Sequence, residues 1–165
     1  MIVKRFTKRW ADTMQRMTSM SAAERLGSYI KRAEQALIAT KTAALKPAGL
    51  TVAQYSALLH LAENPGISAA ALARLAGVTP PTMNTVLTNL QDRGVVDRTP
   101  HEWHKNVLET RLTEEGRTVM NDADVRAIAV ERALAERFTA TELAAVQELL
   151  TRGAQALDEI RDNLA

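Results

Sequence analysis

The sequence predicts a mainly α-helical fold with one small β-hairpin, and three observations support this prediction. Apolar residues recur at helical spacing through most of the 165 residues. Capping residues and Gly or Pro breaks divide that pattern into separate helices. Two short strand-like runs, "VVDR" and "VLETRL", flank the polar stretch "TPHEWHKN" and predict a hairpin with a long tip.

Composition limits the classes of protein that the chain fits. With 46% hydrophobic and 24% charged residues, it suits one compact domain. The absence of cysteine excludes disulfides and thiolate metal sites. No apolar run approaches the roughly 20 residues of a membrane-spanning helix, and no secretory leader is evident. We therefore expect a cytoplasmic protein with no membrane partner.

Residues 1–20 form a basic amphipathic extension. Phe6, Trp10 and Met14 recur at helical spacing among several Lys and Arg residues. This segment either packs on the rest of the protein or on a second subunit, or it binds a membrane surface or a nucleic acid. The sequence leaves these alternatives open.

A long helix is expected from Ser21 to Leu45, within an N-terminal dimerisation segment of residues 21–48. Pro47 and Gly49 end this helix, because neither residue continues a helical backbone well. The apolar positions that predict the helix are Leu26, Tyr29, Ile30, Ala33, Leu37, Ala44 and Leu45.

Residues 49–112 begin with two short capped helices. Thr51 and Gln54 form a capping box, and the helix they start ends at "NPG". Ser68 caps the next helix, "SAAALARLAG". We expect that helix to pack on the core through Leu72 and Leu75.

A third helix follows in the stretch "TPPTMNTVLTNLQDRG". Thr79 is its expected N-cap, and Pro80 suits the first turn, where a missing N–H costs nothing. The residues expected on its buried face are Met83, Val86, Leu87 and Leu90. Pro81, Thr85 and Thr88 are expected on the opposite face, with Thr82, Asn84 and Asn89 at the flanks.

Two short helices joined by a tight turn and followed by a hairpin make a winged helix-turn-helix. In that arrangement the second helix, here the recognition helix, enters a DNA major groove. Thr and Asn side chains can hydrogen-bond to base edges, and a proline ring can pack on thymine methyls. The expected base-reading residues are Pro81, Thr82, Asn84, Thr85 and Thr88. The alternative is that these side chains only solvate an exposed face.

The recognition helix holds no Lys or Arg before Arg93, so the groups that bind phosphates must come mostly from its surroundings. We expect them on the preceding helix, at helix ends and along the hairpin. The expected backbone and wing contacts are Ser68, Arg74, Thr79, Asn89, Arg93, Arg98, His104, Lys105 and Arg111.

Residues 113–165 predict two C-terminal helices that complete the dimerisation region. Thr113 opens the first, whose apolar pattern runs to Phe138, and Thr139 with Glu142 forms the capping box of the second. The last helix carries apolar residues at alternating steps of three and four, as in a coiled coil. The expected dimerisation residues are Leu143, Val146, Leu150, Leu157, Ile160 and Leu164, with Gly153 in the same series. A seam buried inside one chain is the alternative.

These residues resemble the MarR family of bacterial transcription regulators. The similarity covers residues 21–165 and is most specific in "GLTVAQYSALLHLAENPGISAAALARLAGVTPPTMNTVLTNLQDRGVVDRT" and "LETRLTEEGRTVM". The resemblance implies a homodimer with intertwined terminal helices, bound to a pseudo-palindromic operator in double-stranded DNA. It also implies a small aromatic effector that binds between the dimer helices and the winged region and weakens DNA binding.

The chain departs from the family pattern at the DNA-binding surface. Many relatives carry arginine where Thr85 stands and a basic residue where Asn89 stands. At the wing tip, His104, Lys105 and Asn106 replace the family's cluster of acidic and basic residues.

The sequence gives weaker evidence for an effector site, a metal site or an active site. Tyr29, Tyr55 and His60 lie on helices that flank the family's ligand crevice, and they are either effector contacts or ordinary core residues. The stretch "HEWH" could supply two imidazoles and a carboxylate to zinc, but solvated or DNA-contacting histidines are the favoured explanation. No nucleophile, paired-carboxylate or phosphate-loop motif is present, so we expect no enzyme activity, no metal and no cofactor.

The leading hypothesis is therefore a homodimeric DNA-binding regulator, most simply a repressor that an aromatic ligand releases. A second hypothesis is a winged-helix protein-interaction module whose DNA binding is weak or lost, because the expected arginines are missing. A metal-responsive regulator that depends on His101 is a third hypothesis.

Overall fold

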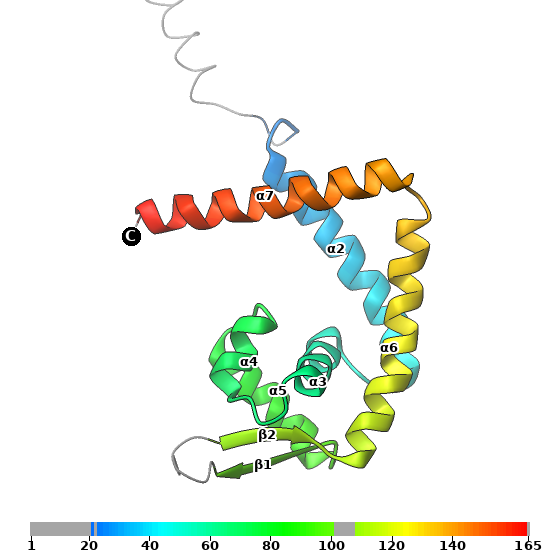
Figure 1. Cartoon of the computed structure of the whole chain (residues 1–165), viewed down its shortest axis with the longest axis vertical. Helices are drawn as coiled ribbons and strands as arrows, with labels where there is room; N and C mark the ends of the chain where they lie inside the picture. The colour runs from blue at the N-terminus through cyan, green and yellow to red at the C-terminus, as the bar shows by residue number, and fades with distance from the viewer. Residues whose placement is uncertain (1–20, 22, 101–107, 165) are drawn as a thin grey trace, which may run out of the picture. The chain divides into compact units, whose positions relative to one another are not determined.

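The computed structural model describes residues 21, 23–100 and 108–164 (Figure 1). Six α-helices, one short 3-10 helix and a two-stranded hairpin occur in these residues. In chain order they are α2 (Leu26–Leu45), η1 (Lys46–Ala48), α3 (Val52–Glu63), α4 (Ala69–Leu75), α5 (Pro80–Asp92), β1 (Val96–Pro100), β2 (Leu108–Leu112), α6 (Glu114–Ala135) and α7 (Ala140–Leu164). The predicted mainly helical fold with one hairpin is confirmed.

The chain divides into two compact units, one up to Thr40 and one from Lys41 onward. In the first unit the predicted start of the long helix is wrong, because α2 begins at Leu26 and not at Ser21. The Ser21 N–H and hydroxyl both donate to the Glu24 carboxylate, at 2.9 and 2.8 Å. These local hydrogen bonds hold a turn that competes with the helix.

The predicted caps are confirmed. The Thr51 N–H donates to Gln54 Oε1 at 3.0 Å and the Gln54 N–H donates to Thr51 Oγ1 at 3.2 Å. Thr139 and Glu142 make the same reciprocal pair at the start of α7. The remaining confirmed N-caps are Ser68, Thr79 and Thr113. Each cap satisfies N–H groups that have no partner inside the helix.

The core of the second unit lies where α3 packs on α5 and α6, and where α4 packs on α5. Leu58, Leu72 and Leu87 are fully buried there. The prediction for Leu75 is wrong, since its side chain is 50% exposed. Ala73 is buried beside Leu72 instead, because a small side chain lets the short helix α4 lie close to its neighbours.

The hairpin is antiparallel, with Val96 opposite Leu112 and Arg98 opposite Thr110. Its strand β1 extends through Pro100, which the sequence pattern assigned to the loop. On its other side β2 pairs with the segment before α4, where the Gly66 N–H donates to the Thr110 carbonyl at 2.9 Å. The strand β1 is thus the outer edge of this small sheet, a position that tolerates proline.

Helix α6 ends at Ala135, so Phe138 lies beyond the helix that its spacing predicted. The residues after Ala135 form a turn, in which the Phe138 N–H donates to the Ala135 carbonyl at 3.1 Å. Thr139 then caps α7. No residue of α7 is buried within this single chain. In the described part of the chain, no helix has the length and apolar character to cross a membrane.

Candidate nucleic-acid interface

The recognition helix α5 is held by a turn that requires glycine. Gly77 adopts a φ of +65°, and the Val78 N–H donates to the Ala73 carbonyl at 3.0 Å across this turn. This left-handed conformation ends α4 and allows α5 to start only three residues later. The sequence "GVTP" therefore determines the angle at which α5 leaves the core.

The two faces of α5 are as predicted. Met83, Val86, Leu87 and Leu90 are buried against α3, α4 and β1. Pro81, Thr85 and Thr88, expected on the opposite face, are exposed, and so are Thr82, Asn84 and Asn89, expected at the flanks. The exposed surface is thus mostly polar and carries no charged side chain before Asp92.

Hydrogen bonds within α5 orient two of the threonines. The hydroxyls of Thr79 and Thr82 lie 2.8 Å apart, so one donates to the other. The Thr85 hydroxyl donates to the Pro81 carbonyl at 3.2 Å. Thr85 therefore offers acceptor lone pairs and a methyl group outward, which suits a base amino group or a thymine methyl.

Arg98 reaches from the wing to the recognition helix. Its Nη2 donates to Asn84 Oδ1 at 3.2 Å. Because guanidinium has no acceptor, the amide oxygen of Asn84 must face Arg98, which leaves the amide nitrogen as the outward donor. Arg98 was expected only to contact phosphate. The structure adds a hydrogen bond to Asn84, which the sequence did not reveal.

Inside the hairpin, two buried polar atoms lie in residues that face each other across the strands. Arg98 Nε and Thr110 Oγ1 have no hydrogen-bond partner in the described part of the structure. Thr110 is fully buried. The base of the wing thus holds Arg98 on the side of the sheet that faces α5.

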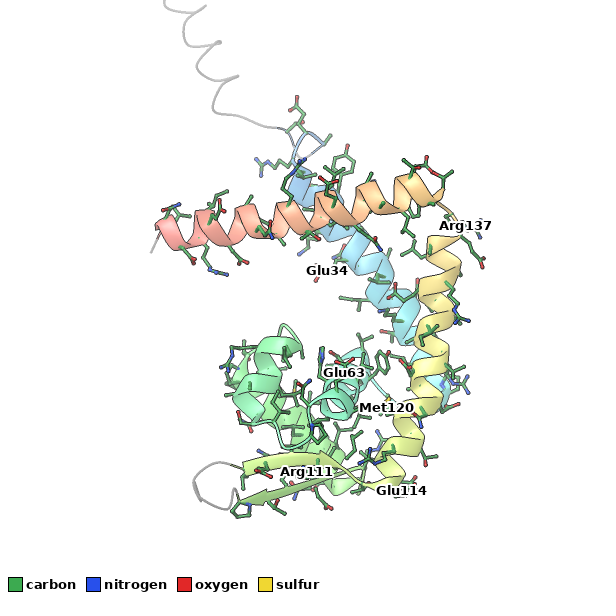
Figure 2. The ribbon with its side chains drawn as sticks, in the orientation of Figure 1. Glu34, Glu63, Arg111, Glu114, Met120 and Arg137 are labelled. Atoms are coloured by element: carbon green, nitrogen blue, oxygen red, sulfur yellow. The ribbon has the colours of Figure 1, made fainter. Side chains whose placement is uncertain are left out.

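The other expected cations are spread around α5. Arg74 is exposed in the last turn of α4. Arg93 donates to the Gly49 carbonyl at 3.0 Å, and Arg111, visible on β2 in Figure 2, pairs with Glu109 at 2.7 Å. These two arginines help to hold the fold, so their charge is partly engaged. His104 and Lys105 lie outside the described residues.

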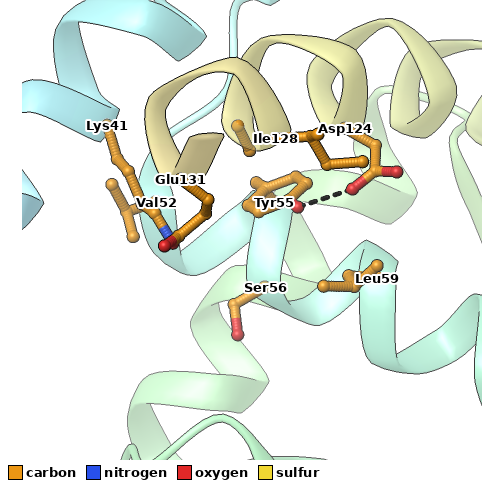
Figure 3. A pocket seen from close by; sticks show the side chains of 9 residues that line it. Lys41, Val52, Tyr55, Ser56, Leu59, Asp124, Ile128 and Glu131 are labelled. Atoms are coloured by element: carbon orange, nitrogen blue, oxygen red, sulfur yellow. Dashed lines mark hydrogen bonds and ion pairs between the residues drawn. The ribbon is translucent and has the colours of Figure 1, made fainter. Parts of the chain in front are cut away.

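A pocket of about 400 Å³ lies between α3 and α6 (Figure 3). It is lined by Lys41, Val52, Tyr55, Ser56, Leu59, Asp124, Ala127, Ile128 and Glu131. Inside it, the Tyr55 hydroxyl donates to Asp124 Oδ1 at 2.8 Å, and Lys41 pairs with Glu131 at 2.5 Å. The pocket thus combines an apolar wall with two polar pairs, as small-molecule sites do.

The structure does not bring the three expected effector residues together. Tyr55 lines the pocket, whereas His60 does not and instead lies 3.7 Å from Glu63. Tyr29 belongs to the first unit, where its hydroxyl donates to the Ala23 carbonyl. The pocket's charged residues Lys41, Asp124 and Glu131 were missed. The spacing of seven between Asp124 and Glu131, on one face of a helix, was the available signal.

Burial, and then the hydrogen bond to Asp124, raise the pKa of Tyr55 well above its usual value of 10.0. Replacing Tyr55 with phenylalanine removes this hydrogen bond, and we expect a loss of about 1 kcal/mol in the free energy of unfolding at pH 7. A raised pKa stabilises the folded state fully below pH 10, and this contribution is lost as the pH rises above that value. The difference between wild type and Tyr55→Phe should therefore shrink between pH 10 and 11.

Urea unfolding at pH 7 and at pH 11 measures this difference. Tyr29→Phe is the matched control, because Tyr29 is the chain's other tyrosine and is 52% exposed. A difference that stays constant with pH would contradict the role of the Tyr55 hydroxyl.

Among the residues that the structure describes, no cluster of three His, Asp or Glu side chains is placed to hold a metal ion. The stretch "HEWH" lies outside them, so the metal-responsive hypothesis has no support from the described geometry.

Helix, glycine turn, exposed recognition helix and hairpin together define a winged helix-turn-helix protein, the class that reads DNA through its second helix. The comparisons are more specific. The model of the MarR family matches residues 48–105. The HTH-type transcriptional repressor Rv2887 of Mycobacterium tuberculosis is 35% identical over 127 residues, which are 77% of this chain and 91% of the repressor. The chain belongs to the MarR family of transcriptional regulators.

Solved structures agree with this assignment. Rv2887 in complex with salicylic acid superposes with a TM-score of 0.63 at 35% identity, covering 78% of this chain and 95% of that one. The transcriptional repressor CouR, known from Rhodococcus jostii, was solved on a 23-mer DNA duplex. It superposes with a TM-score of 0.75 at 27% identity, covering 82% of this chain and 99% of that one.

Proposed function

We propose that the protein is a homodimeric transcriptional repressor that binds a pseudo-palindromic operator in double-stranded DNA. The observation that carries this proposal is the exposed Thr, Asn and Pro face of α5 beside the wing. The DNA complexes of the relatives Rv2887 and CouR support it. A regulator of this kind works in the cytoplasm and needs neither enzyme activity nor a cofactor.

The exposed polar residues of α5 would read bases, and the surrounding cations would bind phosphates. Thr85 presents an acceptor and a methyl group, and Asn84, held by Arg98, presents a donor. The donor suits N7 and O6 of guanine, N7 of adenine or O4 of thymine. The phosphate contacts would come from Arg74, Arg93, Arg98, Lys105 and Arg111, with Ser68, Thr79, Asn89 and His104 as further proposed backbone contacts.

Dimerisation would use the seam of α7. Leu150, Leu157 and Ile160 are each more than half exposed in the single chain, although their spacing is that of a helix interface. A two-fold dimer also places two recognition helices on successive turns of DNA.

A small aromatic ligand would act as effector from the pocket between α3 and α6. The relative Rv2887 was solved with salicylic acid, which supports a ligand of this size. A pocket of about 400 Å³ lies within the range of ordinary ligand sites.

Two substitutions test the division between base and phosphate contacts. Thr85→Ala should change the preference among operator sequences and leave the salt dependence of binding intact, because Thr85 carries no charge. Lys105→Ala should lower the slope of log affinity against log salt by about one unit, because one phosphate contact is lost. Fluorescence anisotropy with DNA flanking the protein's own gene, and with a scrambled duplex, measures both effects over a salt series.

The same titration separates the proposal from its alternative. If wild type binds its flanking DNA no better than the scrambled duplex at any salt concentration, the protein-interaction module is favoured. Identical behaviour of the two variants would refute the assignment of reading to α5 and of phosphate binding to the wing.

A further inference from the structure

The pocket between α3 and α6 is more acidic than a site for a carboxylic acid should be. Asp124 and Glu131 contribute two carboxylates to its lining, and Lys41 contributes the single ammonium group. The formal charge of the lining is therefore negative. This charge would repel an anionic ligand and attract a cationic one.

The one ammonium group is already engaged. Lys41 Nζ lies 2.5 Å from Glu131 Oε1, and the Lys41 side chain is only 19% exposed, compared with 50% for Glu131. A ligand carboxylate could reach Lys41 only by displacing Glu131, which would leave a second carboxylate without its partner. The new ion pair would only replace the existing one, so a ligand carboxylate would gain little from Lys41.

Asp124 has the opposite character. Its Oδ1 accepts the hydrogen bond from Tyr55, and no cationic side chain of the described residues lies within ion-pair distance of it. A carboxylate accepts several hydrogen bonds, so Asp124 retains capacity for a ligand donor. Tyr55, by contrast, already donates its single hydroxyl proton to Asp124 and has no second proton for a ligand.

The rest of the wall is apolar. Val52, Leu59 and Ile128 line it, and Figure 3 shows the Tyr55 ring beside the Asp124 carboxylate. We infer that this pocket binds a flat aromatic ligand that carries a positive charge, such as an amidine or an amine, with that charge on Asp124. The inference rests on the proposed effector role of the pocket, and it names the chemical class of the effector.

A matched ligand series tests the inference on the full chain. The compounds 2-naphthamidine, 2-naphthamide and 2-naphthoate share one ring system and differ in charge. At pH 7 we expect thermal stabilisation to be greatest with the amidine, smaller with the amide and absent with the carboxylate, because a ligand stabilises the fold it binds. Calorimetry then gives the dissociation constant for the amidine.

Two variants test whether the Asp124 carboxylate binds the positive charge of the ligand. Asp124→Asn keeps an acceptor for Tyr55 but removes the negative charge, and it should weaken amidine binding by about 10-fold to 100-fold. Asp122→Asn is the matched control on the same helix, since Asp122 pairs with Arg126 and does not line the pocket. It should leave amidine binding unchanged.

The inference is wrong if the carboxylate stabilises the protein more than the amidine, if none of the three compounds stabilises it, or if the two variants bind the amidine equally well. DNA binding without ligand is measured separately. A failure of the proposed function therefore appears in the DNA titration, and a failure of this inference appears in the ligand series.

Discussion

The variant Gly116→Ala should melt about 10 °C below wild type, which corresponds to a loss of roughly 3 kcal/mol in the free energy of unfolding. Gly116 is buried in the first turn of α6. A Cβ atom at this position would overlap the Val95 carbonyl oxygen and lie 2.9 Å from the carbonyl carbon. Because both partners are backbone, no side chain can rotate to relieve the overlap.

The contact matters because it joins α6 to the base of the wing. The Thr113 N–H donates to the same Val95 carbonyl at 3.2 Å, and the Thr113 hydroxyl donates to the Gly94 carbonyl at 2.8 Å. A displaced Val95 would disturb these hydrogen bonds as well as the N-cap of α6. Both hydrogen bonds therefore add to the expected loss.

Calorimetry on the purified chains measures the effect. Gly27→Ala is the matched control, because Gly27 lies in helix α2 and a Cβ there has no atom within 4 Å. Alanine has the higher helix propensity, so this control should melt at the same temperature as wild type or higher. Equal melting temperatures for Gly116→Ala and wild type would show that α6 does not approach Val95 so closely.

The second large effect is expected at the seam of α7. Leu157→Glu places a charge in the proposed dimer interface, where Leu157 is 59% exposed in the single chain. We expect a monomer, and with it a loss of about 100-fold or more in operator affinity, because two linked half-site contacts become one. Analytical ultracentrifugation and anisotropy on the operator measure the two consequences.

Gln155→Glu adds the same charge on the opposite face of α7 and serves as control. It should remain dimeric and bind the operator as wild type does. A dimeric Leu157→Glu variant with full affinity would exclude the α7 seam as the interface.

The local features of this chain were predictable because their causes lie within a few residues. The Thr51–Gln54 and Thr139–Glu142 capping boxes each pair residues three positions apart, and both form as predicted. The buried and exposed faces of α5 follow from helical periodicity alone. The start of α2 is an exception: its cause is also local, but the sequence did not distinguish the Ser21–Glu24 turn from a first helical turn.

Features that depend on pairing distant segments were not predictable. Tyr55 and Asp124 are 69 positions apart, and the pocket that they share appears only when α3 packs on α6. The sequence could propose Tyr55, but it placed His60 and Tyr29 beside it and missed Lys41, Asp124 and Glu131. Likewise, the exposure of Leu75 depends on how closely α4 approaches its neighbours.

The number and order of the helices, their caps, the hairpin and the uncharged face of the recognition helix could be read from the sequence, since hydrogen-bonding groups and side-chain periodicity act locally. Tertiary packing was needed to show that Arg98 donates to Asn84, that Gly116 leaves room for the Val95 carbonyl, and that two carboxylates share a pocket with one lysine. These three features follow from chain segments that meet only after folding. No short stretch of sequence contains both partners, so these contacts could not be inferred from local patterns.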